Sequence, residues 1–99
     1  MEKDEDILNK KDITSISNPN DILTNIRGIR YKNKKNNQSL LGVISQDIKS
    51  NVPEAIVDKY KVDYTQLVAL LIECIKSNNQ EIKSLKADIK TLKVLLNSS

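Results

Sequence analysis

The last third of the chain carries apolar residues at alternating spacings of three and four. We call these positions the seam, and its one polar member is Asn78. The seam consists of Val68, Leu71, Ile75, Asn78, Ile82, Leu85, Ile89, Leu92 and Leu96. A stripe of this period winds into a left-handed supercoil with other copies of itself, because one helix cannot bury its own stripe. The pattern therefore predicts a self-associating coiled-coil helix over residues 63–96.

The heptad assignment of the seam predicts parallel chains. With Ile82 at position a, Asn78 takes position d, where a polar side chain fixes register at a cost in stability. The g-to-e′ pairs between neighbouring helices then have opposite signs: Glu81 with Lys86 and Asp88 with Lys93. Each such exposed pair contributes less than about 1 kcal/mol. β-branched residues at a with Leu at d favour two strands, so the pattern alone leaves dimer and trimer open.

The first half of the chain alternates between short helical and strand patterns. Asn18-Pro19 predicts a helix start with Asn18 as cap, and Gly28 predicts its stop. Residues 29–32 and 40–44 predict two strands of a hairpin whose polar tip is residues 33–39. Ser45 opens a short helix that ends before Pro53. Residues 55–57 and 60–62 predict a second, smaller hairpin.

The long helix has a clear start signal. Asp63 is expected to cap the amide of Gln66, with Gln66 reaching back as in a capping box, while Val62 and Leu67 form a hydrophobic staple. The predicted class is α+β: a small mixed domain followed by a long C-terminal helix in a parallel coiled coil. The expected divisions are a charged arm at 1–12, the small domain at 13–62, the coiled-coil helix at 63–96 and a tail at 97–99.

The composition excludes several function classes. Sixteen basic and 13 acidic residues give a net charge of +3, which demands neither a nucleic acid nor a membrane partner. The basic cluster is interpreted as a solvated strand face and loop tip: Arg27, Arg30, Lys32, Lys34 and Lys35. Because the chain contains no His and its carboxylates are scattered, we expect no metal and no cofactor.

The same composition predicts a chain that is soluble and free of internal disulfides. Cys74 is the only cysteine, and at heptad position g it is expected to be a small, partly buried side chain. No segment resembles a signal peptide. The longest apolar run, residues 67–72, is too short to span a bilayer.

The centre of the chain resembles a known family. Residues 42–48, G-V-I-S-Q-D-I, and residues 52–57, V-P-E-A-I-V, are similar to the G-F-I-A-Q-E-V…F-P-E-L-V segment of the C-terminal intramolecular chaperone domain. That domain ends phage endosialidase tailspikes and has a relative in myelin regulatory factor. Residues 62–64 and 70–76 are similar to its V-D-Y…L-L-I-E-A-I-K, and residues 26–32 to its L-R-P-V-x-Y. The matching structural positions are Gly42, Gln46, Pro53, Glu54, Asp63 and Tyr64.

The resemblance implies a homotrimer in which small domains cap a three-stranded coiled coil and assist folding of a fibre. The expected partners are further copies of the chain and a fibre or tailspike client. A viral chain would lie in the virion or host cytoplasm, and any other chain of this kind in the cytoplasm. Within the motif, we expect Gly42 to permit close backbone approach and Gln46 to bond main-chain groups. Both roles concern the fold and not catalysis.

The family also cleaves itself with a serine and a lysine in an S-D-x-R-x-K-x-x-I pattern. Matching this pattern backwards from Ile13 puts the lysine at Lys10 and the nucleophile at Glu5. A carboxylate offers no hydroxyl that a neutral amine could deprotonate, so we expect no self-cleavage. The alternatives to a chaperone-like assembly module are an active auto-processing peptidase and a generic coiled-coil adaptor.

Overall fold

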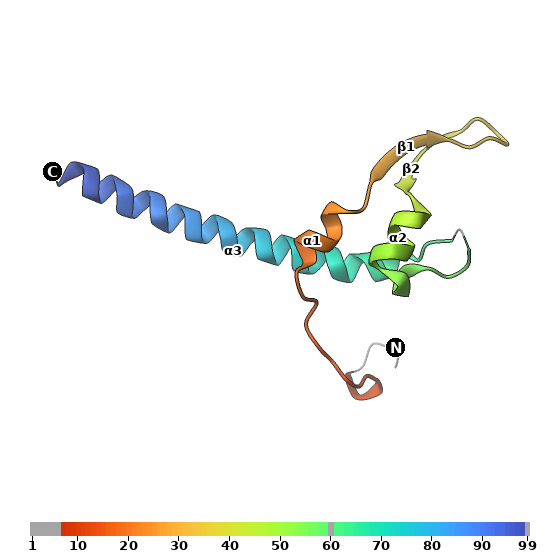
Figure 1. Cartoon of the computed structure of the whole chain (residues 1–99), viewed down its shortest axis with the longest axis horizontal. Coiled ribbons are helices and arrows are strands. Elements are labelled where there is room, and N and C mark those ends of the chain that lie inside the picture. Colours follow the sequence, from red (N-terminus) through yellow and green to blue (C-terminus); the bar gives the residue numbers. More distant parts are fainter. Residues whose placement is uncertain (1–6, 60, 99) are drawn as a thin grey trace.

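A computed structural model describes residues 7–59 and 61–98, and it consists of a small α+β part at one end of a long helix (Figure 1). The elements in chain order are η2 (Ile7–Asn9), α1 (Pro19–Thr24), β1 (Gly28–Lys32), β2 (Ser39–Val43), α2 (Ser45–Asn51), η3 (Pro53–Ala55) and α3 (Tyr64–Asn97). The radius of gyration is 19.7 Å, whereas a compact chain of this length has about 13 Å. The predicted class, with its long C-terminal helix, is confirmed.

The predicted hairpin is present, with strand ends that differ from the prediction by one residue. β1 and β2 pair antiparallel, from Gly28 opposite Val43 to Lys32 opposite Ser39. The tip between them closes through the Asn33 amide, which donates to the Gln38 carbonyl at 2.9 Å. The hairpin projects away from α3 in Figure 1. One of its faces is therefore solvated, and Leu41 is 73% exposed.

The core lies where α2 and η3 meet the first turns of α3. Ile48 and Ala55 are fully buried and pack with Leu67 of α3. Partly buried apolar residues surround this cluster: Ile26, Val43, Val52, Ile56 and Val62. The side chains are small and aliphatic, so this core fixes the first turns of α3 and leaves the rest of the helix without support.

The predicted second hairpin appears in reduced form. Within the described residues 55–59 and 61–62, an antiparallel bridge joins Ile56 and Val62, and the Val57 amide donates to the Lys61 carbonyl at 2.9 Å; Tyr60 lies outside the described residues. The preceding residues form the 3-10 turn η3, in which the Ala55 amide donates to the Val52 carbonyl at 2.9 Å. Pro53 favours this turn because its ring fixes φ and removes one amide donor, so little chain remains to pair as strands.

The end of α1 also differs from the prediction. The helix stops at Thr24, ahead of Gly28, which instead begins β1. The Thr24 hydroxyl donates to the Asn20 carbonyl at 2.8 Å, and the Asn25 side chain donates to the Asp21 carbonyl at 3.1 Å. These short polar side chains engage carbonyls of the last turn and favour an early end. Asn18 caps the helix through its carbonyl only, without a side-chain hydrogen bond.

The start of α3 uses the predicted residue with one change of partner. The Asp63 carboxylate accepts from the Thr65 amide at 3.0 Å, not from the Gln66 amide as predicted. The Asp63 amide already donates to the Ala55 carbonyl at 2.7 Å, so Gln66 has no backbone donor to reach back to. The Gln66 side chain instead makes a long 3.5 Å contact with the carboxylate. Val62 packs against the cluster that contains Leu67, consistent with the predicted staple.

Replacing Asp63 tests the cap. Asp63→Ala removes the acceptor for the Thr65 amide and should lower the free energy of unfolding by about 1 kcal/mol, measured by urea denaturation at one fixed chain concentration. Asp63→Asn keeps a good cap acceptor and should retain most of the stability. Equal losses in both variants would contradict a role for the cap hydrogen bond.

Candidate functional site: an exposed helix seam and the groove beside it

The seam of α3 is exposed along its whole length in the single chain. Its eight apolar members are between 43% and 74% exposed, with Leu71 the least and Leu96 the most. Asn78 is exposed as well. Figure 1 shows α3 extending far past α1, with no other element of the small part beside its C-terminal half. The predicted seam residues thus form one continuous unsatisfied stripe.

A second apolar stripe on α3 is buried by the chain's own small part. Its members are Leu67, Leu70 and Cys74, which are 8%, 3% and 2% exposed, and it continues to the half-buried Ser77. Each of these residues directly precedes a residue of the seam, which displaces the stripe by about 100° around the helix. The spacing of three and four was visible in the sequence, but it was interpreted only for the seam. The predicted burial of Cys74 is confirmed and is more complete than expected.

The small part stops contacting α3 at Asn78. The Asn20 side chain of α1 donates to the Ser77 hydroxyl at 3.2 Å and to Oδ1 of the Asn78 side chain at 3.3 Å. Every described residue after this point, 79–98, is exposed. Asn78 therefore divides the seam into an upper half flanked by the small part and a lower half that stands alone.

An apolar groove of about 260 Å³ adjoins the upper half of the seam. α1, the segment after it and β2 form one wall with Leu23, Ile26 and Val43. The first turns of α3 form the other wall, which includes Leu67 and two seam residues, Val68 and Leu71. Sequence patterns missed this groove because its walls come from segments far apart in the chain.

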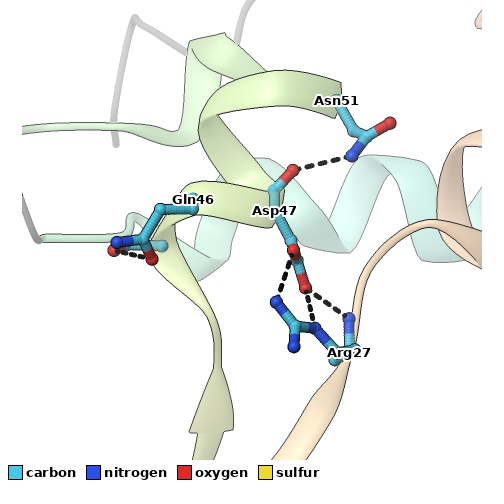
Figure 2. A network of polar contacts seen from close by, with 5 residues as sticks. Arg27, Gln46, Asp47 and Asn51 are labelled. Atoms are coloured by element: carbon cyan, nitrogen blue, oxygen red, sulfur yellow. Dashed lines mark hydrogen bonds and ion pairs between the residues drawn. The ribbon is translucent and has the colours of Figure 1, made fainter.

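An ion pair between Arg27 and Asp47, drawn in Figure 2, lies close in sequence to the groove residues Ile26 and Val43. The Asp47 carboxylate accepts from the Arg27 backbone amide at 3.1 Å, from Nε at 2.9 Å and from Nη2 at 3.1 Å. Arg27 follows Ile26 in the chain, and Asp47 lies in the first turn of α2, shortly after Val43. The Asn51 side chain donates to the Asp47 carbonyl at 2.8 Å. The pair therefore ties the segment after α1 to the start of α2.

The pair shifts the protonation of both partners. Hydrogen bonds from the Arg27 guanidinium and then from its backbone amide lower the pKa of the Asp47 carboxyl. The carboxylate in turn raises the pKa of Arg27, first by its hydrogen bond and then by its charge. Arg27 was predicted to be a solvated member of a basic cluster, and its side chain is 67% exposed; the ion pair with Asp47 was not predicted. The other four members are exposed on β1 and the hairpin tip.

Gly42 lies where two tyrosines approach the backbone of β2. A Cβ at this position would lie 3.1 Å from Cε1 of Tyr31 and 3.4 Å from the hydroxyl of Tyr64. This geometry supports the expected role of Gly42 in close approach. Gln46 is exposed, and its amide oxygen accepts from the Ser45 hydroxyl at 3.3 Å, whereas main-chain partners had been expected. Pro53 and Glu54 are exposed in η3.

The seam and the groove together form a surface suited to binding through apolar contacts. The groove walls named above are aliphatic, and no group of His, Cys, Asp or Glu that could hold a metal occurs within residues 7–59 and 61–98. Glu5, at the family's nucleophile position, lies outside the described residues, and Lys10 is exposed. No helix in the described part of the chain is long and apolar enough to cross a membrane. The seam and the groove can therefore contribute to binding by removing their apolar surface from water.

Comparisons with protein-family models, curated proteins and solved structures find no match to this chain. The likeness to the intramolecular chaperone domain consequently remains a prediction from the quoted motifs.

The Arg27–Asp47 pair predicts an acid-sensitive contribution to stability. Because the folded state lowers the pKa of Asp47, the unfolded state binds its proton more readily, and stability rises with pH. The contribution is present above the unfolded carboxyl pKa of about 3.9 and is lost as pH falls through the lower folded value. Asp47→Asn should therefore lose less stability between neutral pH and pH of about 3 than the unmodified chain does.

The measurement is urea denaturation of both chains at the two pH values. Asp12→Asn is the matched control, since Asp12 is exposed in the N-terminal segment, and it should keep the unmodified pH dependence. An unchanged pH dependence in Asp47→Asn would show that the ion pair does not stabilise the fold.

Proposed function

We propose that this protein is a self-assembly module in which α3 of three copies forms a parallel coiled coil. The small parts would then sit together at one end of the coil. One observation carries the proposal: the whole seam is exposed while the adjacent stripe is buried. The helix is 34 residues long, or about 50 Å, and the small part covers only its first turns.

The charges flanking the seam support a parallel, in-register arrangement. Glu81 and Asp88 at g are placed to meet Lys86 and Lys93 of a neighbouring helix. Within the described residues, neither carboxylate forms an ion pair in its own chain. Their complementary partners are thus available on a second copy, although each pair stabilises the assembly only weakly.

The resemblance supports a more specific role, that of a chaperone-like module which trimerises and assists folding of a fibre client. We propose no peptidase step, because the position that matches the nucleophile is Glu5. The small part contributes a groove next to the seam, which places a binding surface at the end of the coil. In this role, formation of the coiled coil brings the small parts and their grooves together at one end of the assembly.

A coiled-coil adaptor is the second candidate, and the β-branched residues at a with Leu at d favour its two-stranded form. Replacing the lower half of α3 with an unrelated trimeric coiled coil would separate the two roles. An adaptor would keep its partner after the exchange, whereas a chaperone that couples its small parts to its own helix would lose folding activity toward the client.

A charge placed in the seam tests self-assembly. Leu85→Glu puts a carboxylate at a core d position of the lower half, and an unpaired buried charge costs about 3 kcal/mol or more. The concentration at which half of the chains are assembled should rise at least about a hundredfold, measured by sedimentation velocity over a dilution series. Leu85 is 53% exposed in the single chain and lies beyond the end of the small part's contact with α3, so the substitution removes no contact within the chain.

Val94→Glu is the matched control for this variant. Val94 is 60% exposed and apolar, but it occupies heptad position f, which faces away from neighbouring helices. It should assemble as the unmodified chain does. Similar behaviour of the two variants would contradict assembly through the seam.

A further inference from the structure

Ile72 is an exposed apolar residue that the seam does not explain. It occupies heptad position e, and it is 50% exposed. The other e positions of α3 are all polar: Thr65, Asn79, Lys86 and Lys93. An apolar side chain at this one e position offers apolar area to a neighbouring helix in the assembled protein.

Ile72 does not line the groove of its own chain. Leu67 borders the groove, and residues five apart on a helix point about 140° away from each other. Ile72 lies instead beside Ser15 and Ile16, where it lines a separate depression on the other side of α3. An occupant of the groove must therefore come from elsewhere.

Parallel packing brings Ile72 of one helix to the groove of the next. In a parallel in-register coiled coil, position g of one helix faces the e′ position five residues later on its neighbour. This relation pairs Glu81 with Lys86 and Asp88 with Lys93, and it equally pairs Leu67 with Ile72 of the partner subunit. The charge pairs that favour this register therefore also bring Leu67 and Ile72 of the partner subunit together.

We propose that Ile72 of each chain docks into the groove formed by Leu23, Ile26, Val43 and Leu67 of a neighbouring copy. The proposal rests on the self-assembly proposed above, and it holds for two or three strands because both contain the g-to-e′ contact. The occupant is a second copy of this chain, since only the neighbouring helix presents an apolar e residue opposite Leu67. The contact joins the coil of one subunit to the small part of the next.

This contact gives the small part a role in assembly. Its wall residues Ile26 and Val43 lie close in sequence to the Arg27–Asp47 pair described above. A neighbouring helix would cover the apolar surface of the groove, so each small part would be stabilised by the subunit beside it.

Disulfide trapping between two differently marked chains tests the contact. One chain carries Leu23→Cys and the other, labelled with heavy nitrogen, carries Ile72→Cys, both with Cys74→Ala. The chains are unfolded together, refolded and oxidised with oxidised glutathione, and linked peptides are identified by mass spectrometry. We expect a disulfide between the two chains. A Leu23→Cys chain mixed with a Val94→Cys chain is the control and should give none.

A second measurement follows assembly without engineered cysteines. Ile72→Ser should raise the concentration for half-assembly by about tenfold, because each subunit loses an apolar contact. Val94→Ser removes a similarly exposed apolar residue outside the interface and should change that concentration by less than about twofold.

The outcomes separate this contact from self-assembly itself. A monomer at every concentration would reject both proposals. Assembly that depends on Leu85 but gives no Leu23–Ile72 link, with Ile72→Ser equal to Val94→Ser, would keep the coil and overturn the docking. A further chain carries both Leu23→Cys and Ile13→Cys. If this chain forms an internal disulfide and the Leu23–Ile72 link between chains is absent, the groove belongs to the chain's own N-terminal segment and the docking is overturned.

Discussion

The two apolar stripes of α3 lie side by side on one helix, and a small part of this size can cover only one of them. Leu67, Leu70 and Cys74 are buried against it, and the seam beside them faces water. Burying an aliphatic side chain of this kind is worth about 1.5–3 kcal/mol, so the seam represents a large unused driving force. Other copies of the same helix are the surface that matches its period.

Other features of the structure determine which part of α3, and which of its faces, contacts the small part. The cap at Asp63 and the cluster around Ile48 set where α3 begins and which face it turns toward the small part. Asn20 marks the end of that contact at Asn78. Above this point the seam has a groove beside it. Below it, four of the six flanking positions are charged: Glu81, Lys86, Asp88 and Lys93. The small part thus covers one face of α3 as far as Asn78, and the rest of the helix is exposed on all sides.

Local signals account for what the sequence predicted well. The seam, the hairpin with its polar tip, and the short helix ending before Pro53 each depend on residues close together in the chain. Gly42 was singled out through the resemblance, and two tyrosines approach it in the structure.

The errors come from contacts that the local pattern does not contain. The Asp63 amide donates to the Ala55 carbonyl, so it is not available to the Gln66 side chain for the predicted capping box. The 3-10 turn at Pro53 takes up Ala55, and the described residues after it pair through a bridge where a second hairpin was predicted. The groove combines residues from Leu23 to Leu71, so it exists only once α1, β2 and α3 have packed. The proposed contact of Ile72 depends on this groove and on the buried stripe, so the local pattern does not contain it.

Sedimentation equilibrium of the unmodified chain over a wide concentration range tests the central claim most directly. The account predicts a mass three times the 11.2 kDa of one chain, with dissociation only on dilution. A twofold mass would keep the seam but favour the two-stranded adaptor over the chaperone-like trimer. A constant single-chain mass at micromolar concentrations would contradict the account.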